Sequence, residues 1–130
     1  MVCLDTDILV GLLRGEQSAI EKISYLETSE TLFTTPLSAT ELFMGAYKSK
    51  YQEENIEQVQ QLLNNLKLLE YDLESSKLAG QIIEKLREEG KHIGEIDCII
   101  GGIVLAHNEI LITRNIDHFN RIPNLRLEKW

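Results

Sequence analysis

The sequence predicts an α/β fold in which a central parallel sheet of four or five strands is flanked by helices. Its 130 residues match the usual size of one domain. The content of 43% hydrophobic and 26% charged residues is typical of a folded protein. Short apolar runs also alternate with helical patterns along the chain, as they do in α/β proteins. Because no linker or repeat is visible, we expect residues 1–130 to form a single domain.

The first part of the chain alternates between strand and helix patterns. Val2–Leu4 is a short apolar run that ends at an acid, and helical spacing then continues to Leu13, with Asp7 as a candidate N-cap. Apolar residues recur every three positions over Gln17–Leu26, which predicts a second helix. Leu32–Thr34 then predicts a second strand.

The middle of the chain contains three amphipathic patterns. Apolar stripes at helical spacing predict helices over Leu37–Tyr51 and Glu54–Lys67. Leu68–Leu69 is a candidate short strand. A further amphipathic helix is expected over Asp72–Glu89, with Gly90 as its stop.

The last part supplies the most apolar helix and the remaining strands. Glu95–His107 is apolar on nearly all sides, as expected of a helix covered on both faces. Ile110–Ile112 predicts a buried strand, and the apolar residues at 125 and 127 predict a weak edge strand. Active groups in parallel sheets gather beyond the carboxyl ends of the strands. Asp5 and Thr113 directly follow apolar strands, so we expect both at that edge.

The charge balance excludes several classes of protein. A net charge of −8 argues against an unaided, nonspecific DNA-coating protein, which would need many basic side chains. The longest stretch without a charged or strongly polar side chain, Cys98–Ala106, is far shorter than the roughly 20 residues of a membrane span. The first residues lack a secretory signal, so we expect a cytoplasmic protein without a membrane segment. Cys3 and Cys98 are then expected to be small buried side chains rather than a disulfide.

Four acids are candidates for chemistry, and each also has a structural interpretation. Asp5 follows a strand, where an aspartate can simply stabilise a turn. Asp7 suits helix capping. Glu41 lies three residues after Ser38, the spacing of a capping box. Asp97 falls in the first turn of the apolar helix, where the helix dipole favours an acid.

The placement of three of these acids favours a metal site. Asp5, Glu41 and Asp97 follow a strand or open a helix at one edge of the expected sheet. Two carboxylates about 4 Å apart repel by about 4 kcal/mol at an effective dielectric of about 20, so three would need a counterion. Oxygen ligands suit Mg²⁺ or Mn²⁺. We expect no zinc, because the three histidines lack the usual ligand spacing.

The motifs that carry these residues resemble those of PIN-domain ribonucleases and, within that family, the VapC toxins of toxin–antitoxin pairs. The resemblance covers essentially the whole chain to Trp130. It rests on four motifs in order, which are Leu4-Asp5-Thr6-Asp7-Ile8-Leu9, Ser38-Ala39-Thr40-Glu41-Leu42, Ile96-Asp97-Cys98-Ile99-Ile100-Gly101-Gly102, and Ile112-Thr113-Arg114-Asn115 with Phe119.

The resemblance implies a site for Mg²⁺ or Mn²⁺ built from Asp5, Glu41 and Asp97. Asn115 stands where the family has a fourth acid, and Asp117 is the nearest carboxylate to it, so either could complete the site. Positions whose side chains support the acids in the family are Thr6, Asp7 and Thr113 in this sequence. The implied reaction is hydrolysis of RNA by metal-activated water, leaving 5′-phosphate and 3′-hydroxyl ends.

The resemblance also implies partners. Among the basic residues that could contact the RNA backbone, Arg114 is preferred because it adjoins the site, followed by Arg14. A cognate VapB-like antitoxin is expected to insert a segment near the site. A homodimer is also expected, with the apolar stripes of residues 37–67 as candidate surfaces unless they pack internally.

Two other functions remain possible from the sequence. Asn115 in place of an acid is compatible with a PIN-like protein that binds RNA or a partner without cutting. The opening Asp5-Thr6-Asp7 also resembles aspartyl-phosphate phosphatases, with Asp5 as nucleophile and Asp7 as general acid. Those enzymes need a later lysine at the site, and none is apparent.

Overall fold

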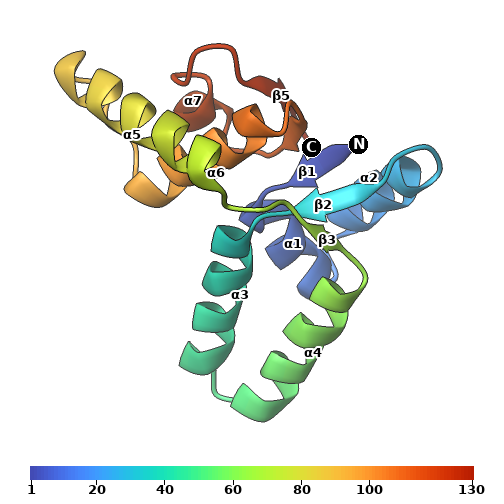
Figure 1. Ribbon diagram of the computed structural model, residues 1–130. Helices are drawn as coiled ribbons and strands as arrows, with labels where there is room; N and C mark the ends of the chain where they lie inside the picture. The colour runs from blue at the N-terminus through green and yellow to red at the C-terminus, as the bar shows by residue number, and fades with distance from the viewer.

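Five short parallel strands form the centre of the structure, a computed structural model that describes residues 1–130 (Figure 1). The sheet order is β3-β2-β1-β4-β5, and every neighbouring pair is parallel. The strands are β1 (Val2–Leu4), β2 (Leu32–Thr34), β3 (Lys67–Leu68), β4 (Ile110–Ile112) and β5 (Arg126–Glu128). The predicted parallel sheet is therefore confirmed, with five strands.

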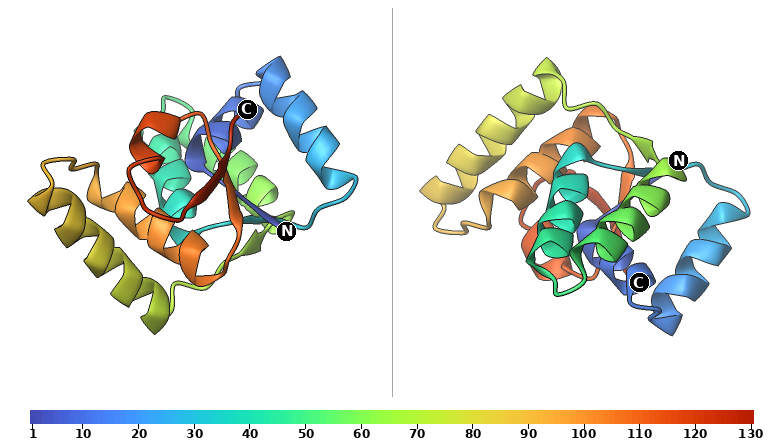
Figure 2. Two further views of the ribbon diagram at one scale, coloured as in Figure 1. Left: turned by 90° about the horizontal axis from the view of Figure 1, so that it is seen from above. Right: turned by 90° about the horizontal axis from the view of Figure 1, so that it is seen from below.

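Helices cover both faces of this sheet (Figures 1 and 2). The helices α1 to α4 contribute to one buried cluster, while α5, α6 and α7 contribute to the other. Because side chains alternate along a strand, Val2 and Leu4 enter the first cluster and Cys3 enters the second. The helices are α1 (Thr6–Leu13), α2 (Gln17–Glu27), α3 (Pro36–Lys48), α4 (Gln52–Asn64), α5 (Leu73–Glu88), α6 (Glu95–Ala106) and α7 (Ile116–Phe119).

Two helix pairs shape the surface around the sheet. Figure 1 shows α3 and α4 extending side by side away from the sheet as a hairpin. On the other face α5 packs closely on α6. A Cβ atom at Gly102 would lie 2.9 Å from the backbone nitrogen of Ala79, so α6 needs a glycine at this contact.

Neither of the two candidate helix caps forms, so Asp7 and Glu41 are available for other contacts. Asp5, not Asp7, is the N-cap of α1, and the helix already begins at Thr6. Thr35 caps α3 through a 3.0 Å hydrogen bond from the Ser38 backbone N–H. Ser38 therefore is not an N-cap, the expected capping box does not form, and Glu41 lies in the second turn of α3. Pro36 at the first helical position explains the earlier start.

The other differences between the predicted and the observed helices and strands are small. Helix α3 ends at Lys48, before the expected Tyr51, and β3 comes one residue earlier than predicted. The short helix α7 was not predicted, because four residues are too few to show a period. Cys3 and Cys98 are both buried as expected, and burial raises the pKa of each thiol. None of the helices has the length and apolar character needed to cross a membrane.

Candidate active site

Asp5 lies at the carboxyl end of the central strand β1 and is almost fully buried, with 5% of its surface exposed. Its backbone N–H donates to Ile112 O of β4, which holds it at the sheet edge. The Thr113 hydroxyl donates to Asp5 Oδ2 at 2.7 Å. Burial raises the pKa of Asp5 to about 7, the Thr113 bond opposes this shift, and the charges of Asp7 and Asp97 add to it. The hydrogen bond from Thr113 therefore does not offset the cost of burying an ionised Asp5 side chain.

Asp7 does not cap a helix, and its carboxylate contacts three other residues. Its Oδ1 accepts a 3.0 Å hydrogen bond from the indole N–H of Trp130. Its Oδ2 accepts a 2.8 Å bond from the backbone N–H of Arg114 and lies 3.2 Å from the Thr113 hydroxyl. Both carboxylate oxygens are thus engaged within the chain, which fits the supporting role that the resemblance implied.

Glu41 reaches the same edge from α3. The Thr6 hydroxyl donates to Glu41 Oε1 at 2.6 Å and lies 2.9 Å from the Ser38 hydroxyl. Since Thr6 directly follows Asp5 in the chain, this bond ties the Glu41 carboxylate to the start of α1. Thr6 therefore contacts Glu41, and its supporting role stays a prediction.

Asp97 enters from the first turn of α6 and contacts the segment after β4. The Asn115 side-chain amide donates to Asp97 Oδ2 at 3.4 Å, and the Asn115 backbone N–H donates to Thr113 Oγ1 at 3.0 Å. His118 Nδ1 lies 3.3 Å from Asp97 Oδ2 and 3.0 Å from Asn115 Nδ2. The sequence did not indicate this role for His118, because its only signal is a spacing of three residues from Asn115 across the short helix α7.

These acids share one edge but do not form a closed metal cage. No three of the acidic, histidine or cysteine side chains lie close enough together to hold an ion in their present positions. Neither Asp5 nor Glu41 pairs with a lysine or arginine, and the only ionic partner of Asp97 is His118. The donors are carboxylate and amide oxygens beside a desolvated acid, so their chemistry fits a hard divalent cation.

The remaining predicted residues are less closely tied to the acids. The Arg114 guanidinium donates to Glu16 and to the Ser18 hydroxyl, and it stacks 3.4 Å above the Trp130 ring. The Arg114 guanidinium is therefore already engaged by contacts within the chain. Arg14 is exposed, and its side chain makes no hydrogen bond. Asp117 is also exposed and makes no hydrogen bond, so Asn115 rather than Asp117 adjoins the acids.

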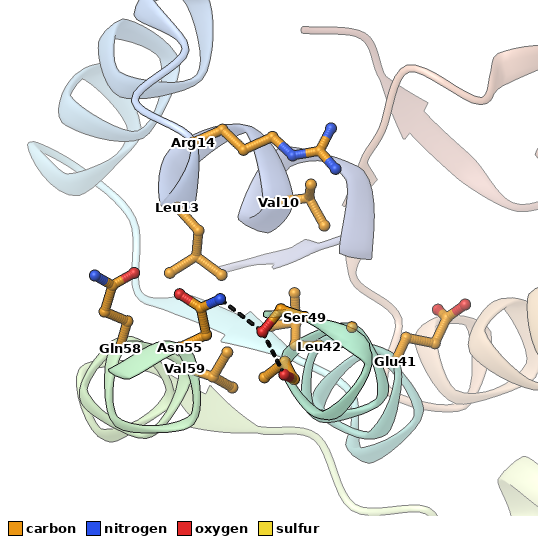
Figure 3. A pocket seen from close by; sticks show the side chains of 11 residues that line it. Val10, Leu13, Arg14, Glu41, Leu42, Ser49, Asn55, Gln58 and Val59 are labelled. Carbon is orange, nitrogen blue, oxygen red and sulfur yellow. Dashed lines mark hydrogen bonds between the residues drawn. The ribbon is translucent and has the colours of Figure 1, made fainter. Parts of the chain in front are cut away.

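A pocket of about 280 Å³ opens beside Glu41, between α1 and the α3–α4 hairpin (Figure 3). Val10, Leu13 and Val59 supply part of its apolar lining. Arg14 and Glu41 contribute the charged side chains of its lining, and Figure 3 shows them on different helices. The lining of the pocket thus combines apolar side chains with Glu41, one acid of the site.

The fold and the site can be compared with known proteins. The family model described as the PIN domain matches residues 2–125. The chain belongs to the PIN-domain family. This PIN domain is 31% identical over 128 residues to ribonuclease VapC2 of Rickettsia felis, which covers 98% of this chain and 96% of that protein. It is 30% identical over 127 residues to the tRNA(fMet)-specific endonuclease VapC of Salmonella typhimurium, with the same coverage.

Solved structures give the same assignment. The PIN domain matches the structure of VapBC2 from Rickettsia felis bound to a promoter DNA fragment with a TM-score of 0.92 and 30% identity, covering 100% of this chain and 99% of that chain. It matches DNA-bound VapBC from Salmonella typhimurium with a TM-score of 0.90, 30% identity and the same coverage. The resemblance to VapC-type PIN domains, drawn from four motifs, is confirmed.

Proposed function

We propose that this PIN domain is an endoribonuclease that uses Mg²⁺ or Mn²⁺ and serves as the toxin of a toxin–antitoxin pair in the cytoplasm. The observation that carries the proposal is Asp5, a buried carboxyl with no cationic partner, beside Asp97 at the carboxyl edge of the sheet. Burying an unpaired carboxylate is costly, and a bound cation removes that cost. The relatives named ribonuclease and endonuclease VapC support the choice of reaction.

In this proposal, Asp5, Glu41 and Asp97 hold the ion, and Asn115 completes the polar edge. When bound, Mg²⁺ or Mn²⁺ neutralises the scissile phosphate and lowers the pKa of an attacking water. The chain's other residues orient the ligands. Thr113 fixes Asp5 and Thr6 fixes Glu41, while Asn115 holds the carboxylate of Asp97. No side chain of the protein has to act as a nucleophile.

The same proposal assigns the pocket beside Glu41 to an antitoxin of the VapB type. The similar structures from Rickettsia felis and Salmonella typhimurium are VapBC complexes. An apolar segment of the partner would cover Val10, Leu13 and Val59, and a basic side chain at its end would pair with Glu41. This arrangement would block the site without touching Asp5.

The expected homodimer concerns the outer face of the α3–α4 hairpin. Leu42, Ala46 and Val59 pack internally, so part of the apolar stripe belongs to the core. Met44 and Tyr47 remain 50% and 59% exposed and line a separate shallow groove. We propose this face for self-association.

RNA cleavage with added metal tests the proposed reaction. We expect cleavage with Mg²⁺ or Mn²⁺, its loss with EDTA, and its loss in Asp5→Asn and Asp97→Asn. Asp117→Asn is the matched control, because it makes the same change at an exposed carboxylate without contacts. Metal-independent cleavage, or full activity of both site variants, would contradict the proposal. RNA binding without cleavage would instead favour a non-catalytic role, and a phosphoryl adduct on Asp5 would favour the phosphatase.

A further inference from the structure

The chain ends in a side chain that reaches back to the acidic site. Trp130 follows β5, whose parallel pairing with β4 brings the end of the chain to the edge that carries Asp5. Both views in Figure 2 show the C-terminus beside α1. Trp130 is half-buried and packs against the cluster formed by α1 to α4. The last residue is therefore part of the folded structure around the site.

Helix α1 has a glycine, Gly11, at the point where the indole ring packs on it. A Cβ atom at Gly11 would lie 2.9 Å from the Cη2 atom of Trp130, closer than side-chain carbons normally approach. Glycine inside a helix costs about 1 kcal/mol relative to alanine. Its presence in α1 is explained by the close packing of the indole and of Ala19, whose Cβ would lie 3.0 Å from the added atom. On the other side, the Arg114 guanidinium stacks on the same ring and bonds to Glu16.

We propose that Trp130 and Arg114 form a clamp that holds the Asp7 carboxylate and thereby positions Asp5, so that Trp130 sets the geometry of the metal site. The clamp consists of Trp130 and Arg114, and Asp7 is the side chain that it holds. This inference rests on the proposed function, because it takes Asp5 as a metal ligand. It makes Trp130 a positioning residue that does not touch substrate or ion.

The mechanism follows from the hydrogen-bond capacity of Thr113. A threonine hydroxyl has one proton to donate, and two carboxylates lie within reach, at 2.7 Å for Asp5 and 3.2 Å for Asp7. Asp7 already accepts from the Trp130 indole and from the Arg114 backbone N–H. The indole N–H holds Oδ1 and the Arg114 N–H holds Oδ2, so the clamp fixes the orientation of the Asp7 carboxylate and keeps the shorter Thr113 bond on Asp5. Without the indole N–H, the Asp7 carboxylate would be free to turn toward Thr113 and compete for its proton, and Asp5 would lose its fixed orientation.

If the clamp positions Asp5, loss of the indole N–H alone should weaken the binding of the metal ion. Trp130→Phe keeps an aromatic ring below Arg114 but cannot donate to Asp7. We expect the Kd for Mn²⁺, measured by electron paramagnetic resonance of the free ion, to rise about tenfold, the scale on which outer hydrogen bonds act at metal sites. The control is Lys22→Ala, which breaks the 2.6 Å ion pair between Lys22 of α2 and Glu128 at the end of β5 without touching Asp7. The control is expected to bind Mn²⁺ as the wild type does.

A spectroscopic measurement that leaves Trp130 in place tests the same point without Trp130→Phe. Trp130 is the only tryptophan, so its indole N–H gives one resonance in an N–H correlation NMR spectrum. We expect titration with Mg²⁺ to shift this resonance with the same Kd as calorimetry reports, and Asp5→Asn to abolish the shift. This NMR measurement tests the clamp even if Trp130→Phe does not fold.

The outcomes separate the clamp from the proposed function. If the wild type binds the ion through Asp5 but Trp130→Phe binds it equally well, or the indole resonance does not move, the clamp is wrong and the metal site stands. If the wild type binds no ion, or Asp5→Asn binds as the wild type does, the metal site is wrong and the positioning role falls with it.

Discussion

Replacing Thr113 by valine removes one hydroxyl from the centre of the site at nearly constant volume. Thr113 is fully buried, and its hydroxyl donates to Asp5 at 2.7 Å and accepts from the Asn115 N–H at 3.0 Å. A hydrogen bond to a charged group contributes about 1.5–3 kcal/mol. We therefore expect Thr113→Val to lower the free energy of unfolding of the metal-free protein by about 2–3 kcal/mol at about pH 8, where Asp5 is ionised.

The loss of stability caused by Thr113→Val should depend on pH. The pKa of Asp5 is about 7 in the folded protein, and removal of the Thr113 bond, which lowers it, raises the pKa further. At about pH 5 the carboxyl is protonated in both proteins, so the difference should shrink to about 1 kcal/mol, the value of a neutral hydrogen bond.

Urea unfolding at the two pH values measures the Thr113→Val effect, with Thr113→Ser as the control. Thr113→Ser keeps the hydroxyl and loses one methyl group, at a cost of about 1 kcal/mol that does not change with pH. An equal loss for Thr113→Val at both pH values, or none at pH 8, would refute the assigned role of this hydroxyl.

Three further predictions address the packing and the charge of the site. Gly11→Ala should unfold about 1–3 kcal/mol more easily than Gly80→Ala in urea, because its Cβ meets the Trp130 ring, whereas Gly80 has open space. Gly102→Ala should lower the melting temperature, because its Cβ would press on the backbone of α5; an unchanged value would contradict this contact. Without metal, stability should fall as pH rises from about 4 to about 7, since the folded state keeps a proton on Asp5 that the unfolded chain releases. Mn²⁺ should therefore raise the melting temperature more at about pH 8 than at about pH 5.5, and an equal rise would count against Asp5 as a ligand.

The sequence predicted the residues that its local pattern places at the sheet edge. Asp5 and Thr113 directly follow apolar strands, and parallel strands bring such positions together. Asp97 follows from an apolar helix that opens with an acid. The fold class follows from the alternation of strands and helices, which depends on neighbours in the sequence.

What the sequence could not give are contacts and caps decided by the tertiary structure. Trp130 and Asp7 are separated by 123 positions, so no local pattern links them. His118 lies near Asp97 because of the position of α7, which no local pattern in the sequence indicates. Asp7 and Ser38 both have cap chemistry, but each helix began earlier than expected, and their side chains were used elsewhere.

The most direct test of the central claim is the position of Mn²⁺ in a crystal of the protein, read from its anomalous scattering. We expect one strong peak at the carboxyl end of β1, about 2.1 Å from oxygens of Asp5 and Asp97, with Glu41 turned toward the same ion. Ions bound at separate carboxylates, or a peak remote from Asp5 at saturating Mn²⁺, would contradict it.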